Sequence, residues 1–282
     1  MKQLKGFTVV VGLTLACAVR ADPVTFEAAG ANAAAIMASR DAFRAAIGGG
    51  TVAGANGSFG GVRREINWDG VPDAQADPNP FSANFFNVNS PRGVVFSTPG
   101  TGFLVSANAG QSAPVLFGFP NDFQVFSAQR LFTAVNSNIT DVRFFVPGTA
   151  TATTTSAFGL VFVDVEAAGS TRLQFFDVND VLIYSHDALV GGNQGLTFLG
   201  ATVDSATIAR VRITSGSNTI VSNGVLGSQI DDIVVMDDFL YAEPLQAVPE
   251  PSTTALMGLG MLVAFAAQRR RRAAAARGDR GR

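Results

Sequence analysis

The stretch Ile208-Ala209-Arg210-Val211-Arg212-Ile213 alternates arginines with aliphatic residues. Successive side chains of a β-strand point to opposite faces of the sheet, so the two arginines take one face and the neighbouring aliphatic side chains take the other. The alternation predicts a strand within residues 208–214 whose two faces differ in polarity.

Similar short runs, rich in Val, Ile, Phe and Thr and bounded by Gly, Pro and Asn, recur along the chain. Besides 208–214, the candidate strands are residues 93–96, 103–107, 115–119, 141–146, 157–165, 171–176, 181–184, 196–203 and 230–241. Turns and not helices separate these runs, so we expect a mainly β fold: an antiparallel β-sandwich with jelly-roll topology over residues 51–244.

A helix is expected before the strands, in an alanine-rich segment at residues 22–50. Its apolar positions recur at spacings of three, four and seven residues: Phe26, Ala29, Ala33, Ile36, Phe43 and Ile47. Three consecutive glycines at 48–50 end it.

The 23 phenylalanines supply much of the expected core. We expect the following side chains to be buried between two sheets: Phe96, Phe117, Phe144, Phe158, Phe162, Phe175, Phe198, Val211, Ile213, Val235 and Phe239.

The first 21 residues have the layout of a secretory signal peptide. Lys2 and Lys5 precede an apolar run at 7–16, and small residues follow as far as Ala21. Cys17 is the only cysteine and is lost with this segment, so the mature chain has no disulfide and no thiolate ligand or nucleophile.

The tail, residues 245–282, combines a prolyl motif at 248–252, an uncharged apolar run of 15 residues at 253–267 and an arginine-rich end at 269–282. A bilayer core takes about 20 helical residues, and tilting or local thinning of the bilayer makes up the difference. We therefore expect a transmembrane segment, with the arginines on the cytoplasmic side and the body exported.

The order of these parts resembles the PEP-CTERM sorting signal, whose motif corresponds here to Val248, Pro249, Glu250 and Pro251. The resemblance implies handling by an exosortase-type membrane protease and cleavage near the motif. The body is also similar to a recurring ectodomain of PEP-CTERM proteins without an assigned activity. The similar segments are residues 64–73, 89–94, 157–159, 163–165 and 236–239.

The body is acidic, although the whole chain has a formal net charge of −2. Residues 22–248 contain 10 arginines, no lysine and 20 acidic residues, which gives a net charge of about −10. A nucleic-acid partner is therefore not expected, because phosphate binding requires a positive surface. Divalent cations suit such a surface better.

The sequence assigns no catalytic residue. His186 is the only histidine, and Ser185-His186-Asp187 is interpreted as a solvent-facing turn because adjacent residues seldom converge as a triad. The possibility of a carboxylate pair for glycoside hydrolysis stays open, because the distance between two such groups in the fold cannot be read from their spacing in the sequence.

Six aspartates are candidate calcium ligands, in two groups: Asp69, Asp73 and Asp77, then Asp231, Asp237 and Asp238. The alternative is that they are solvated or cap turns. Trp68, the sole tryptophan, is a candidate sugar platform if it is exposed and a core residue if it is not.

Together these features predict an exported, non-enzymatic protein of the cell surface or extracellular matrix. The setting implied by the resemblance is adhesion or association with exopolysaccharide. Two alternatives stay open: a polysaccharide-active enzyme with a carboxylate pair, and a purely structural surface module.

Overall fold

The computed structural model describes residues 22–49, 62–110, 115–205, 207–221 and 231–244, with isolated positions 261, 265, 268 and 269. The chain divides into two units, Met1–Leu245 and Gln246–Arg282. The predicted signal peptide and the sorting motif lie outside the described residues, as do most of the predicted transmembrane run and arginine-rich end. Within the described ranges, no helix has the length and hydrophobicity needed to cross a membrane.

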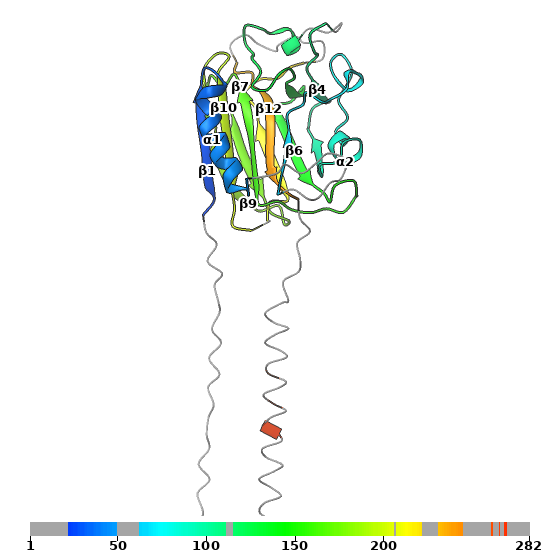
Figure 1. Ribbon diagram of the computed structural model, residues 1–282, viewed down its shortest axis with the longest axis vertical. Coiled ribbons are helices and arrows are strands. Elements are labelled where there is room, and N and C mark those ends of the chain that lie inside the picture. The colour runs from blue at the N-terminus through cyan, green and yellow to red at the C-terminus, as the bar shows by residue number, and fades with distance from the viewer. Residues whose placement is uncertain are drawn as a thin grey trace, which may run out of the picture. The chain divides into compact units, whose positions relative to one another are not determined.

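The first unit contains two antiparallel sheets (Figure 1). The larger sheet has the order β1-β10-β7-β12-β5-β4, and β2 pairs with β12. Its strands are β1 (Val24–Gly30), β2 (Arg63–Ile66), β4 (Gly102–Val105), β5 (Phe132–Val135), β7 (Ala157–Val163), β10 (Leu196–Thr202) and β12 (Val235–Ala242).

The smaller sheet has the order β3-β6-β11-β8-β9. Its strands are β3 (Val94–Ser97), β6 (Ile139–Phe144), β8 (Arg172–Phe176), β9 (Leu182–Asp187) and β11 (Arg210–Thr214). The helical elements are α1 (Ala33–Ala46), the single turn α2 (Phe85–Val88) and two 3₁₀ turns, Asp73–Gln75 and Val115–Gly118. The mainly β, antiparallel class predicted from the sequence is confirmed.

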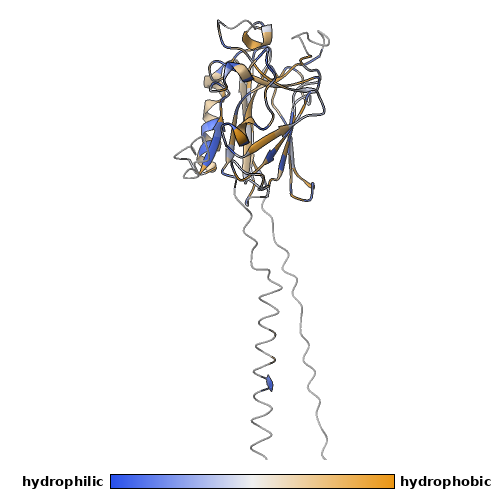
Figure 2. Ribbon diagram, turned by 90° about the vertical axis from the view of Figure 1, so that its right-hand side faces the viewer, coloured by the Kyte–Doolittle hydropathy of each residue, from blue (hydrophilic) through white to orange (hydrophobic). Residues whose placement is uncertain are grey.

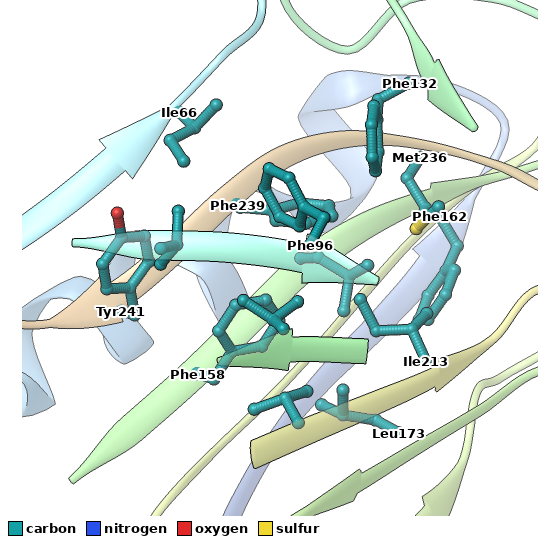
Figure 3. Close-up of a cluster of buried hydrophobic side chains, with 14 of the residues drawn as sticks. Ile66, Phe96, Phe132, Phe158, Phe162, Leu173, Ile213, Met236, Phe239 and Tyr241 are labelled. Carbon is teal, nitrogen blue, oxygen red and sulfur yellow. The ribbon is translucent and has the colours of Figure 1, made fainter. Parts of the chain in front are cut away.

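One hydrophobic cluster joins the two sheets (Figure 3). Phe158 and Phe239 from the larger sheet belong to it together with Val211, Ile213 and Phe175 from the smaller one. Val211 and Ile213 are fully buried, as the alternation in β11 predicts. The inward faces of both sheets therefore share one core.

A second cluster covers the other face of the larger sheet. Ile36 and Phe43 of α1 pack there with Phe198 of β10 and Val235 of β12. All eleven predicted core residues are buried, but Phe117, Phe198 and Val235 belong to this second cluster and not to the space between the sheets. The larger sheet is apolar on its outer face as well where α1 covers it, and Figure 2 shows hydrophobic colouring over much of the folded body.

The N-terminal helix is shorter than predicted. Residues Val24–Gly30 form β1, which pairs with β10 along its whole length, and α1 begins only after Asn32. The Asn32 side chain accepts a hydrogen bond from the Ala35 amide at 3.3 Å and caps the helix. Alanine-rich periodicity is ambiguous over seven residues, and here the pairing with β10 decides the conformation.

Four other strand assignments differ from the sequence interpretation. Residues 115–118 form a 3₁₀ turn, with positive φ at Leu116 and Phe117, and β12 begins at 235 and not at 230. The four-residue strands β2 and β5 were not predicted. Strand β2 pairs along its length with β12, more than 170 residues away in the chain, whereas β5 pairs along its length with β4 and at one position with β12.

Candidate functional site

The two ends of the folded body lie at one end of the larger sheet. Val24 opens β1 opposite Thr202 of β10, which lies opposite Ala157 of β7. The neighbouring residue Phe158 lies opposite Tyr241 of β12. The start of β1 and the finish of β12 therefore fall in adjacent rows at this end of the sheet, here called the chain-exit end (Figure 1).

An ion pair fixes the last residues of the body at the chain-exit end. Arg64 of β2 donates from Nε and Nη2 to the two carboxylate oxygens of Glu243, each at 2.8 Å. Its Nη1 also donates to the carbonyl of Pro91 at 3.2 Å. The Arg64 side chain is fully buried and that of Glu243 is 9% exposed, so this is a bidentate pair shielded from water.

Two further contacts hold the finish of β12. The Thr155 hydroxyl donates to the carbonyl of Ala242 at 2.7 Å, and the Tyr241 hydroxyl donates to the carbonyl of Arg92 at 3.0 Å. Burial raises the pKa of Tyr241, so its hydroxyl stays protonated and able to donate. The clamp formed by Arg64, Thr155, Tyr241 and Glu243 immediately precedes the tail, and the sequence analysis did not find it.

The predicted calcium ligands Asp237 and Asp238 lie at a bulge in β12, where the pairing with β7 shifts by one residue. Asp237 is fully buried and accepts hydrogen bonds from the amides of Phe126 and Ser127 at 2.7 and 3.2 Å. The Ser127 hydroxyl donates to Asp238 at 2.9 Å. Burial, reinforced by the Asp238 charge, raises the pKa of Asp237 well above its usual range. The pair therefore holds the 126–130 loop.

The remaining predicted calcium ligands have protein partners or lie apart from one another. Asp69 accepts from the Arg130 amide at 3.1 Å, Asp73 pairs with the Arg130 guanidinium at 2.5 Å, and Asp231 accepts from Asn218 at 3.4 Å. Burial raises the pKa of Asp77. Within the described ranges no three Asp, Glu, His or Cys side chains are placed to hold a metal ion, so the structure does not assemble the predicted calcium site.

Of the two alternatives for Trp68, a sugar platform or a core residue, the structure supports the core residue. Trp68 is 1% exposed and stacks on Phe132 with ring centroids 4.0 Å apart. Phe86 and Phe239 meet it edge-on. Its neighbours are the phenylalanines of the core between the sheets, so the indole acts as a packing residue.

The segment Ser185-His186-Asp187 is part of strand β9 and not a turn. The His186 Nε2 lies 2.9 Å from a carboxylate oxygen of Glu27 in β1, while Asp187 pairs with Arg172. Successive strand residues point to opposite faces, so the three side chains do not converge as a catalytic triad requires.

Asp164 is a buried carboxyl group that the sequence analysis did not single out. It accepts from the Gln194 amide at 2.7 Å and has a positive φ of 75°. Burial, together with the nearby charges of Glu166, Asp122 and Asp232, raises its pKa to about 7. No local sequence pattern marks Asp164, because Gln194, Asp122 and Asp232 lie far from it in the chain.

Residues 247–272 match the PEP-CTERM protein-sorting motif. The chain carries a PEP-CTERM sorting signal. This finding confirms the resemblance of the tail and indicates an exported protein processed at its C-terminus, since a PEP-CTERM signal implies processing by an exosortase, a membrane protein. The matched segment begins four residues after the clamp residue Glu243. No curated protein matches the chain.

Proposed function

We propose that the mature protein is a non-enzymatic component of the cell surface or extracellular matrix, adhesive or associated with exopolysaccharide. The PEP-CTERM signal carries the proposal, because it marks the chain for export and tail processing. What then reaches the outside is the folded body, which ends at the clamp.

We further propose that the body is a jelly-roll sandwich. Strands β5, β12, β7 and β10 are neighbours in the larger sheet, and β6, β11, β8 and β9 are neighbours in the smaller one. The eight strands from β5 to β12 are consecutive in the chain and are divided between the two sheets in these orders. This arrangement over one core is expected of two combined Greek keys, that is, of a jelly roll.

The chain-exit end supports a membrane-proximal precursor. The predicted signal peptide precedes Val24, and the predicted transmembrane run starts nine residues after Pro244. Eight intervening residues, fully extended, reach about 26–29 Å. Before processing, the body would therefore be tethered within this distance of the predicted transmembrane run.

The enzyme alternative requires two carboxylates flanking a space for a sugar and, in an inverting mechanism, a water. Asp237 and Asp238 are the adjacent buried carboxylates, yet amide and hydroxyl donors of the 126–130 loop occupy them. Their bonding supports a structural role, and this favours the non-enzymatic proposal.

The test follows the full-length chain in a host that contains an exosortase. Wild-type protein is expected in the surface or matrix fraction, and enzymatic removal of the exopolysaccharide is expected to release it. Pro249→Ala combined with Glu250→Ala should leave the protein in the membrane fraction. Asp279→Asn, outside the matched residues, is the control and should behave as wild type. Wild-type protein that stays in the membrane, or a surface pool unaffected by removal of the polysaccharide, would contradict the proposal.

A further inference from the structure

The outward face of the smaller sheet carries four of the ten arginines of the body. Phe96, Val142, Val211 and Phe175 point inward, so their neighbours along each strand point outward. We call this surface the arginine face; its residues are Asp141, Arg143, Arg172, Gln174, Phe176, Arg210 and Arg212. Next to this face, Ser185 and Asp187 of β9 are exposed. The arginine face is not covered by helix α1, which packs on the larger sheet.

Two arginines lie directly opposite each other on this face. The strand register pairs Arg210 of β11 with Arg143 of β6. Like charges directly opposite across strands destabilise a sheet. In a body with a net charge of about −10, these two guanidinium groups bring positive charge to one face, where Asp141 and Asp180 pair with Arg210.

Neighbouring side chains hold the central arginine rigidly. Arg210 is 4% exposed, and its guanidinium lies 3.7 Å from the centroid of the Phe176 ring. It donates to Asp141 at 3.1 Å and to Asp180 at 2.5 Å. Asp141 also accepts from Arg212 at 2.8 Å. The centre of the face is therefore ordered before any ligand arrives.

Around this centre the arginines are accessible to solvent. Arg143 is exposed, and the described residues place no carboxylate within 4.0 Å of its guanidinium. The side chains of Arg212 and Arg172 are 39% and 44% exposed. The hydrogen bond from Arg210 holds the pKa of Asp180 below its usual range, and the charges of Arg210, Arg143 and Arg212 add to this effect.

We propose that the arginine face binds an acidic, carboxylate-bearing polysaccharide. Guanidinium groups match carboxylates in bidentate geometry, and a flat sheet face offers successive donors to an extended chain. Among the described residues of this face, Arg143 supplies a guanidinium without a carboxylate partner, and the exposed Arg212 and Arg172, which pair with Asp141 and Asp187, lie along the same face. This inference rests on the proposed association with exopolysaccharide and names the chemistry of that ligand.

The experiment measures binding of the full-length protein in detergent to polygalacturonate, with dextran as the neutral comparison. Arg143→Gln is expected to weaken binding of polygalacturonate roughly tenfold, the loss of one charge-assisted contact, and Arg143→Glu to weaken it further. Arg143→Lys should retain part of the affinity. Arg40→Gln makes the same change in net charge on α1, where Arg40 pairs with Asp41 at 2.8 Å, and should bind as wild type. Unchanged melting temperatures show that the variants are folded.

Binding that weakens with salt, prefers polygalacturonate to dextran and depends on Arg143 but not on Arg40 would support the site. Equal losses for Arg143→Gln and Arg40→Gln would overturn it, because binding would then follow net charge alone. Wild-type protein that binds dextran as well as polygalacturonate would also overturn it. In both contrary cases, association with the matrix in cells could still be observed. Failure of the arginine face as a binding site is therefore distinguishable from failure of the proposed function.

Discussion

Arg64 and Glu243 lie 179 positions apart in the chain and form a bidentate ion pair with both nitrogen–oxygen distances at 2.8 Å. The pair joins the first residues of β2 to the residue that follows β12. Because both side chains are buried, removing one partner leaves the other charged and without compensation.

Arg64→Ala is therefore expected to lower the free energy of unfolding by about 3–5 kcal/mol. Replacing both partners, as in Arg64→Met with Glu243→Leu, should recover most of that loss, since neither charge is then buried. Urea denaturation of the purified variants measures both effects. A loss below about 1 kcal/mol for Arg64→Ala would show that the pair is hydrated in solution.

Phe158→Ala tests the core between the sheets. Phe158 is fully buried and its ring lies 5.4 Å from that of Phe239. Emptying this position should cost about 3–5 kcal/mol in urea denaturation. Val178→Ala, at a side chain that is 71% exposed, is the control and should stay within about 0.5 kcal/mol of wild type. Equal effects of the two substitutions would contradict the observed core.

The sequence predicted what depends on local pattern. The alternation in β11 correctly predicted that Val211 and Ile213 point inward. The expectation that phenylalanines form much of the core is also confirmed. Strand β2, with the sequence Arg63-Arg64-Glu65-Ile66, was missed because three charged residues hide a strand whose conformation is set by pairing with β12.

The candidate sites were predicted less well, for a related reason. Trp68 and the six aspartates have side chains suited to sugars and calcium, but residue type does not reveal burial or convergence. The contacts of Asp237 come from a loop 110 positions away, and those of Arg64 from residue 243. The arginine face, in contrast, could be anticipated in part, since the spacing of Arg210 and Arg212 already puts them on one face.

Asp237→Ala is expected to destabilise the body by about 3 kcal/mol, because the amides of Phe126 and Ser127 lose their buried acceptor. Asp231→Ala, at an exposed neighbour in sequence, is the control and should be nearly neutral. Differential scanning calorimetry compares the two. A neutral Asp237→Ala would argue against its role in holding the 126–130 loop.

Asp164 predicts a specific dependence of stability on pH. Its pKa is about 7 in the folded protein against an ordinary value of 3.8, so the folded state holds a proton that the unfolded state releases. Its contribution to stability is full below about pH 4, falls as the pH rises to about 7, and is lost above that. The slope is at most about 1.4 kcal/mol per pH unit.

Asp164→Asn keeps an oxygen acceptor for the Gln194 amide and removes the titration. The difference in unfolding free energy between wild type and this variant should therefore change between pH 4 and 7 and stay level above that range. A difference that is constant with pH would show that Asp164 is ionised in the folded protein.

Intact-mass spectrometry of the protein recovered from the cell surface tests the central claim most directly, namely that the body is exported and its PEP-CTERM tail is removed. We expect a mature form whose C-terminus lies near residues 248–252, just beyond the clamp at Glu243. A surface-located form whose mass includes Arg269 to Arg282 would contradict it.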